Sequence, residues 1–181
     1  MENSDDHNNI PVWAFEAIEI KEPNPMWKDK GIQEREELYN LLSPFGVKQI
    51  EHIGSTAIPN LPAKPIIDLM AFISSLEHVN KIAEHLFSTD WHYVPPELDK
   101  RPWRRFFVKV KNDKRVAHLH IMQEGDERWE KQLIFRNKLR AHPHLVEEYA
   151  NLKSQLAKEY NKNREDYTEA KTDFINKVIY N

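Results

Sequence analysis

The chain contains no cysteine, which excludes a disulfide framework and any catalysis by a thiolate. It also has no apolar run near the roughly 18 residues that a membrane-spanning helix requires, so no membrane partner is expected. The first residues lack the basic and then apolar pattern of a secretory signal, and we therefore expect a cytoplasmic protein. A basic excess is missing as well, since the formal net charge is -3, and nucleic acid is not an expected partner.

The composition is typical of a soluble globular protein. Hydrophobic residues make up 40% and charged residues 30% of the 181 residues, a length that suits one buried core. The start of the chain is polar and acidic, so we expect residues 1–10 to form a disordered tail and residues 11–181 a single domain. The sequence gives no indication of the oligomeric state.

The spacing of apolar residues predicts strands early in the chain and helices in its last third, which is an α+β arrangement. The expected strands are an edge strand at Ile18 and Ile20, and residues 47–53, 64–73, 92–94, 103–110 and 115–122. The expected helices are residues 27–42, 76–87 and 127 to the end, with an interruption at Pro143. Residues 111–114 favour a hairpin turn, and residues 95–102 a loop.

A glycine and two hydroxyl residues lie between the second and third of these strands. Gly54 allows the backbone to approach a ligand closely, because it has no side chain. Ser55 and Thr56 follow at what would be a helix N-terminus, where free N–H groups favour an anion such as phosphate. We interpret this turn as a phosphate-binding element, and the alternative is an ordinary turn.

Asp68 lies inside the apolar run of residues 66–73, where a charge destabilises the fold unless it is paired or binds a metal. The histidines at 118 and 120 are two apart on an expected strand, so both imidazoles lie on one face. With Asp68 they would form a set of two histidines and one carboxylate, which suits Mn, Fe, Ni or Zn better than Mg. Two other interpretations of His118 and His120 stay open: direct binding of a phosphate, or ordinary hydrogen bonds to the backbone.

Several cations are candidates for phosphate contacts. Arg136 and Arg140 are four apart on an expected helix and share a face, although a solvated charged face is an equal alternative. Arg105 lies on the strand beside the histidines, and Lys64 lies at the start of the strand that carries Asp68. An arginine fork suits phosphate, and a lysine supplies a point charge.

Lys171 is the least ordinary of the cations. It lies at helical spacing between Tyr167 and Phe174, on the apolar stripe of the last segment. An ammonium group there must extend outward to water or meet an anion. We predict that Lys171 reaches the same cavity as the Gly54–Ser55 turn.

The order of these elements resembles a known pattern. Gly-Ser followed after about a dozen residues by an Asp in an apolar strand is similar to the signature of the nucleotidyltransferase superfamily. The fuller set resembles the GrpB family within that superfamily: residues 52–57, 64–68, Arg105-Phe106, His118-Leu119-His120, Phe135-Arg136, residues 139–143, Tyr167, Ala170-Lys171 and Phe174-Ile175. The resemblance covers roughly residues 25–179 and implies a nucleotidyltransferase-like mixed sheet packed with helices, with a helical C-terminal third.

The resemblance implies a site that binds a nucleotide or another phosphorylated small molecule. Superfamily enzymes usually carry a second carboxylate where this chain has Met70, and a third on a strand like that of His118 and His120. Methionine does not bind Mg²⁺, which prefers oxygen ligands, so the usual two-metal mechanism is in question. Three hypotheses follow: a nucleotidyltransferase-like enzyme using a divalent metal (Mn, Mg or Zn), a non-catalytic nucleotide-binding module, and a metal-dependent hydrolase that uses Asp68, His118 and His120.

Overall fold

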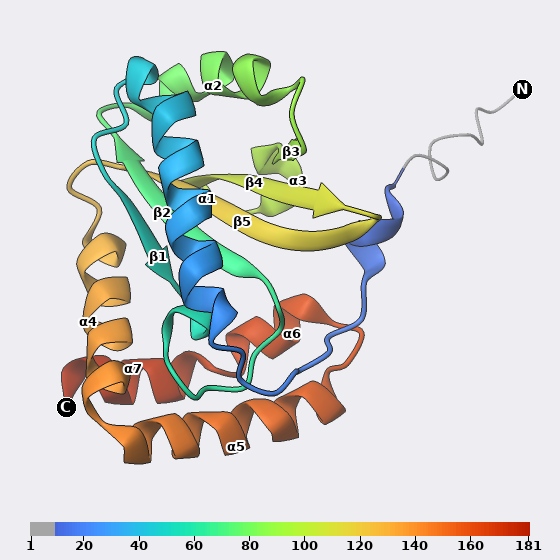
Figure 1. The fold of residues 1–181 in the computed structure, drawn as a ribbon, viewed down its shortest axis with the longest axis vertical. Helices are drawn as coiled ribbons and strands as arrows, with labels where there is room; N and C mark the ends of the chain where they lie inside the picture. Colours follow the sequence, from blue (N-terminus) through green and yellow to red (C-terminus); the bar gives the residue numbers. More distant parts are fainter. Residues whose placement is uncertain (1–9) are drawn as a thin grey trace, which may run out of the picture.

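The computed structural model describes residues 10–181, whose centre is one five-stranded sheet (Figure 1). The strands are β1 (Ile50–Ile53), β2 (Ile67–Ile73), β3 (Trp91–Val94), β4 (Arg104–Lys111) and β5 (Lys114–Gln123). Their order in the sheet is β1-β2-β5-β4-β3, with β2 and β5 parallel and every other pair antiparallel. The predicted α+β class with a mixed sheet is therefore confirmed, while the expected tail lies almost wholly outside the described residues.

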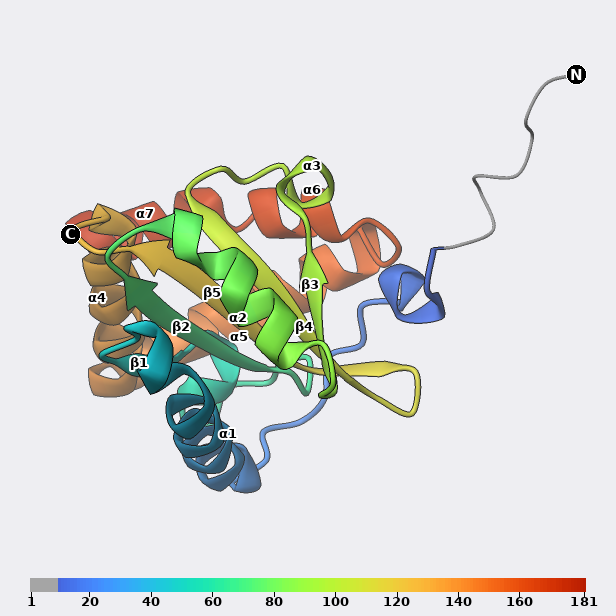
Figure 2. The same cartoon turned by 90° about the horizontal axis from the view of Figure 1, so that it is seen from above.

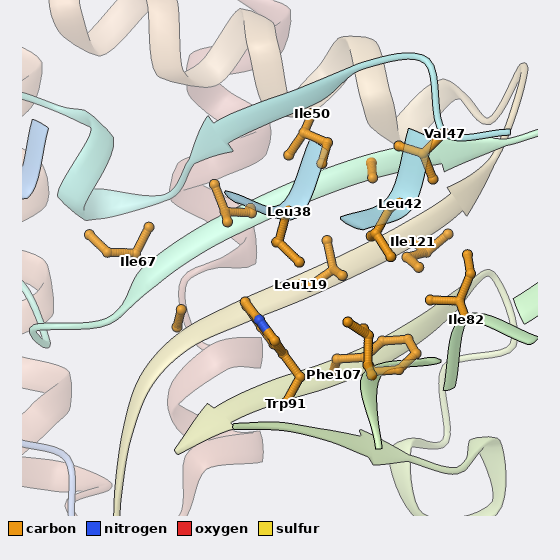
Figure 3. Packing of buried hydrophobic residues seen from close by; sticks show 14 of the residues in the cluster. Leu38, Leu42, Val47, Ile50, Ile67, Ile82, Trp91, Phe107, Leu119 and Ile121 are labelled. Atoms are coloured by element: carbon orange, nitrogen blue, oxygen red, sulfur yellow. The ribbon is translucent and has the colours of Figure 1, made fainter. Parts of the chain in front are cut away.

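One face of the sheet packs on two helices, α1 (Met26–Leu42) and α2 (Val79–Leu86). Figure 3 shows how Leu38 and Leu42 of α1 and Ile82 of α2 contact side chains of this face. The inward residues of the strands alternate along the chain, as Leu119 and Ile121 do on β5. Burial of this apolar layer leaves the opposite face of the sheet to carry the polar residues described below.

The C-terminal helices are grouped together in Figures 1 and 2, away from α1 and α2. They are α4 (Glu127–Ala141), α5 (Pro143–Glu159), α6 (Arg164–Glu169) and α7 (Thr172–Tyr180). The predicted interruption at Pro143 is confirmed, because this residue begins α5. Two apolar clusters, one of α4, α5 and α7 and another of α5 and α6, hold these helices together.

The hairpin prediction is also confirmed, with Asn112 and Asp113 both at positive φ between β4 and β5.

The predicted edge strand at Ile18 and Ile20 is wrong. A short 3-10 helix, Val12–Phe15, precedes an irregular segment that makes one isolated bridge to the sheet region, and Ile18 packs against α5 and α6 instead. The expected loop at 95–102 contains a short helix, α3 (Pro96–Asp99). No helix in residues 10–181 is both long and apolar enough to cross a membrane.

Candidate functional site

Asp68, His118 and His120 meet on the sheet face opposite α1. Asp68 of β2 pairs with His118 of the parallel strand β5, and His120 lies two residues further on the same face. The Asp68 Oδ1 atom is 3.0 Å from Nδ1 of His118 and 3.5 Å from Nε2 of His120. The predicted convergence of these three side chains is confirmed as geometry. The Asp68 side chain keeps 29% of its surface exposed, so a ligand can reach it.

The electrostatics of this trio follow from burial and hydrogen bonding. Burial acts to raise the pKa of Asp68, but the bonds from His118 and His120 outweigh it and hold that pKa well below its usual range. Burial lowers the pKa of His118 to about 4 despite the neighbouring carboxylate, and burial also lowers the pKa of His120. Near neutral pH the trio is one ionised carboxylate beside two neutral imidazoles.

The Gly54 turn lies directly against Asp68. Gly54 has φ +73°, and a Cβ atom there would lie 2.8 Å from Oδ2 of Asp68, so both the conformation and the space require glycine. Ser55 begins a 3-10 helix, Ser55–Ala57, rather than an α-helix. The Thr56 hydroxyl is not directed to this site. It lies 2.9 Å from Nε2 of His52 and donates to the Ile66 carbonyl at 3.2 Å.

Lys64 and Lys171 approach the same region from segments far apart in the chain. Both ammonium groups lie over the Tyr167 ring, at 5.1 Å for Lys64 and 4.3 Å for Lys171. Burial lowers the pKa of Lys64 to about 7, with a further contribution from Lys171, and burial lowers the pKa of Lys171 to about 8. The Asp68 carboxylate acts in the opposite direction on both amines, which places all three groups in one electrostatic environment.

A third lysine, Lys153 on α5, belongs to this group and was missed by the sequence analysis. Its side chain is 2% exposed, donates to the Pro62 carbonyl, and lies 5.2 Å from the Tyr149 ring. Burial, with smaller contributions from Lys171 and Lys64, lowers its pKa to about 7. The signal was present in the sequence: Lys153 falls four residues after Tyr149 on an apolar stripe, the same pattern that identified Lys171.

Arg104 on β4 is the second functional candidate that the sequence analysis missed. Its Nε and Nη2 atoms donate to the two Asp99 carboxylate oxygens at 2.9 and 2.6 Å, and its Nη1 contacts Nδ1 of His120. The guanidinium also lies 4.1 Å from the Phe106 ring, and both Arg104 and Asp99 are buried. The Asp99–Arg104 pair therefore holds Nδ1 of His120, the ring nitrogen opposite the one near Asp68.

The neighbouring Arg105, which the sequence analysis chose, is directed to the other face. The prediction that Arg105 lies on the strand beside the histidines is confirmed, but Arg105 pairs with Ile121 whereas Phe106 pairs with His120, so its side chain does not share their face. Its guanidinium donates instead to the carbonyls of Pro102 and Arg104. The choice between two adjacent arginines depends on the register of the hairpin.

Arg136 and Arg140 support the turn from outside. Arg136 donates to Glu51 at 2.8 Å and to the His52 carbonyl at 2.9 Å, and Arg140 donates to the Ala57 carbonyl at 2.8 Å. These contacts brace the backbone on both sides of Gly54. The structure therefore assigns both arginines to holding the turn, and it does not place their charges beside Asp68.

A surface cavity of about 420 Å³ lies apart from Asp68, between α4, α5 and the segment after the turn. The charged residues in its lining are Glu22, Glu147 and Arg140, while most of the remainder are apolar or proline. Two carboxylates against one guanidinium do not favour a phosphate. The lysine group beside Asp68 is the better anion site on charge alone.

The trio meets the distance requirement for a metal site but not the hydrogen-bond requirement. One ligand atom from each of Asp68, His118 and His120 lies within 4.8 Å of the others. A metal-bound histidine normally donates its other N–H to an acceptor. Nδ1 of His120 meets a guanidinium, which only donates, and Nε2 of His118 is the one buried side-chain N or O atom in residues 10–181 without a partner. These surroundings do not fit a resident metal ion.

Met70 confirms the departure from the usual superfamily pattern. It is fully buried and packs with Ile53, Met122 and Trp129, so no second carboxylate stands beside Asp68 on β2.

Comparison with known proteins identifies the family. The family model described as GrpB protein matches residues 17–181. The chain belongs to the GrpB family. It is 37% identical over 164 residues to UPF0157 protein YqkA of Bacillus subtilis (strain 168). The match covers 91% of this chain and 47% of that protein, so this chain spans about half the length of this relative. Glutamate-rich protein GrpB of Alkalihalophilus pseudofirmus is 31% identical over 135 residues, covering 74% of this chain and 78% of that protein.

Solved structures agree with this assignment. Conserved protein GrpB from Enterococcus faecalis has a TM-score of 0.77 at 31% identity, covering 89% of this chain and 94% of that one. The poly(U) polymerase Cid1, with Mg 3'-dATP bound, has a TM-score of 0.55 at 14% identity, covering 83% of this chain and 49% of that one. At that identity the likeness to Cid1 shows the fold alone, and it confirms the expected nucleotidyltransferase-like fold.

Proposed function

We propose that this GrpB-family protein binds a nucleoside triphosphate, or a similar phosphorylated small molecule, at the site formed by Asp68, Lys64, Lys153 and Lys171, which is called the pocket below. The observation that carries the proposal is the grouping of three lysines over two tyrosine rings, Lys64 and Lys171 over Tyr167 and Lys153 over Tyr149, in the electrostatic environment of Asp68. When protonated, the three lysines in the environment of a single carboxylate give an excess of positive charge in partly desolvated surroundings. A polyphosphate chain supplies the missing negative charge, and each lysine gives it a point charge.

The turn gives this pocket its shape. Gly54 brings bare backbone against Asp68, and Ser55 follows with its hydroxyl close enough to Tyr149 to act on the phenol. Asp68 stays ionised, so it can accept a hydrogen bond from a ligand hydroxyl. His118 and His120 hold the carboxylate in place from the sheet side.

Titration with a nucleoside triphosphate tests the proposal. Lys171→Met keeps most of the stem and removes the charge, so affinity should fall by about 1–3 kcal/mol, the scale of a hydrogen bond to a charged group. Lys177→Met is the matched control, because Lys177 is an exposed lysine on α7, the helix that begins directly after Lys171. Equal affinities of the wild type and Lys171→Met would contradict the proposal.

Transfer of a nucleotidyl group is the finer form of the proposal. The acceptor hydroxyl would attack the α-phosphorus, pyrophosphate would leave, and the hydroxyl proton would pass to Asp68 or to water. Release of pyrophosphate from a bound triphosphate in the presence of candidate acceptors measures this step. Binding without release would identify the protein as a nucleotide-binding module of the same fold.

A metal-dependent hydrolase is the second candidate, favoured by the closeness of the ligand atoms of Asp68, His118 and His120. A bound Mn²⁺ or Zn²⁺ would supply an activated water in such a site. The surroundings of the histidines oppose it, because Nδ1 of His120 contacts a guanidinium and Nε2 of His118 has no hydrogen-bond acceptor. Titration of the protein with Mn²⁺ or Zn²⁺ alone separates this candidate from the anion pocket.

A further inference from the structure

We propose that the pocket binds its phosphorylated ligand without a metal ion, because the Asp99–Arg104 pair keeps His120 from acting as a metal ligand and the three lysines supply the positive charge. The inference rests on the proposed binding function and adds how that binding works. Binding without a metal ion differs from the metal-dependent binding expected of a nucleotidyltransferase-like fold.

The proton on His120 is placed by Arg104. A guanidinium carries only donors and stays charged, so Nδ1 of His120, which contacts it, must offer a lone pair. A neutral imidazole with a bare Nδ1 carries its proton on Nε2, the nitrogen that lies 3.5 Å from Asp68. A metal at Nε2 would have to displace this proton and leave the ring with none.

Arg104 is not free to move away from the histidine. It makes two hydrogen bonds to Asp99, lies against the Phe106 ring, and is 8% exposed. Loss of this arrangement would leave the buried Asp99 carboxylate with only Arg101, at 3.9 Å, as a cationic neighbour, which is costly. The tautomer of His120 is therefore built into the fold rather than chosen by a ligand.

His118 leads to the same conclusion by a different contact. Its Nδ1 lies 3.0 Å from the ionised Asp68 carboxylate, so this nitrogen carries the proton and donates it. Metal binding through Nδ1 would move the proton to Nε2, which is buried without an acceptor. Both imidazoles are thus arranged to donate to Asp68, and the lone pair that His118 keeps lies on Nε2, which is buried.

Positive charge reaches the pocket from three other elements. Lys64 comes from the segment before β2, Lys153 from α5, and Lys171 from the junction of α6 and α7. The charged and titratable groups around them are Asp68, His118, His120, Arg115, Arg164 with its partner Glu16, Tyr149 and Tyr167. The ammonium groups outnumber the carboxylates, so a phosphate needs no metal to be neutralised.

The metal affinity of the protein with and without the Arg104 guanidinium tests the first half of the inference. Arg104→Gln places an amide oxygen where the guanidinium was, which can accept a proton from Nδ1 of His120. We expect little Zn²⁺ binding by the wild type and an affinity at least about 10-fold higher in Arg104→Gln, the scale of a change in a partner of a metal-bound histidine. Arg105→Gln is the matched control and should behave like the wild type. Tight Zn²⁺ binding by the wild type, or no gain in Arg104→Gln, would overturn the inference.

Titration with inorganic tripolyphosphate tests the second half. Binding in EDTA, with no gain when Mg²⁺ replaces the chelator, is the expected result. Binding that requires Mg²⁺ would overturn the inference and leave the proposed function intact. No binding in either buffer would overturn the proposed function and this inference with it, while the Zn²⁺ result would still report on the histidines.

Discussion

Lys153 is a buried cation that a bound anion would stabilise. Its ammonium is almost fully enclosed, and its nearest carboxylate must also serve Lys64 and Lys171. A desolvated cation without its own counterion loses its proton easily. A bound phosphate reverses this by supplying negative charge at short range.

Lys153→Met should weaken tripolyphosphate binding by roughly 10-fold or more, as expected for one charged hydrogen bond. The physical reason is loss of a point charge that no other group replaces. Calorimetric titration measures the change, and Lys158→Met, an exposed lysine on the same helix, is the control. Equal losses in both variants would mean that the effect is one of overall charge rather than of the pocket.

Anion binding should weaken as the pH rises through 7 and 8. The pKa values of Lys64 and Lys153 are about 7 and that of Lys171 is about 8, so these groups lose charge over this interval. A bound anion stabilises the charged form and raises each pKa, so binding at pH 8 should take up protons. Titration heats in two buffers of different ionisation enthalpy measure the uptake, and an affinity that does not change with pH would contradict the assignment of the lysines.

At the scale of elements, the contact of α1 with β1 depends on a glycine inside a helix. A Cβ atom on Gly31 would lie 2.1 Å from Nδ1 of His52, so the ring occupies the space that a side chain would need. His52 then bonds Thr56, which in turn bonds the Ile66 carbonyl. Through these contacts α1 supports the Gly54 turn on the side away from Asp68.

Gly31→Ala should destabilise the protein by about 1–3 kcal/mol, the scale of overpacking, although alanine favours a helix over glycine. Chemical denaturation measures the change in unfolding free energy. The control is the same substitution in a His52→Ala background, where the space is open and alanine should be neutral or stabilising. A stabilising effect of Gly31→Ala in the wild type would contradict the close packing of α1.

At the scale of the whole molecule, the sheet has one apolar face and one face that encloses polar groups under the C-terminal helices. The second face holds Asp68 and two neutral histidines, and its burial makes stability sensitive to acid. The same face requires α5, α6 and α7 to supply Tyr149, Lys153, Tyr167 and Lys171. Because segments far apart in the chain contribute to the pocket, we expect it to form only when the whole domain folds.

Stability should fall as the pH drops from about 6.5 to 4. Burial lowers the pKa of His52 and His118 to about 4, so the unfolded chain takes up protons near pH 6.5 while the folded chain does not. The unfolded state binds more protons across this interval, and the free energy of unfolding therefore decreases with falling pH. Below the ordinary range of aspartate, protonation of Asp68 should add to the loss, since its folded pKa is also lowered.

Urea denaturation at several pH values measures this profile. His142→Gln, at an exposed position between α4 and α5, should leave it unchanged, whereas a variant that replaces His118 should flatten it. A stability that stays constant from pH 6.5 to 4 would contradict the neutral state of the buried histidines.

Local chemistry in the sequence determined much of the site. The period of two along a strand placed His118 and His120 on one face, and the apolar run around Asp68 required the carboxylate to be paired. The positive φ of Gly54 and the hairpin at 111–114 follow from residue types that tolerate such backbone conformations. These features depend on neighbours in the chain, so the sequence alone could predict them.

Only the tertiary structure decided which cations face the pocket. Arg104 rather than Arg105 contacts His120, because the strand register, with its irregularity at Lys109 and Val110, sets which residues share a face, and a slip of one residue reverses every side chain. Ile18 lies against α5 and α6 rather than in a strand because packing partners distant in the chain outweigh its local preference. Lys153 is buried because helices far apart in the sequence cover it, and burial of this kind is a property of the assembled core.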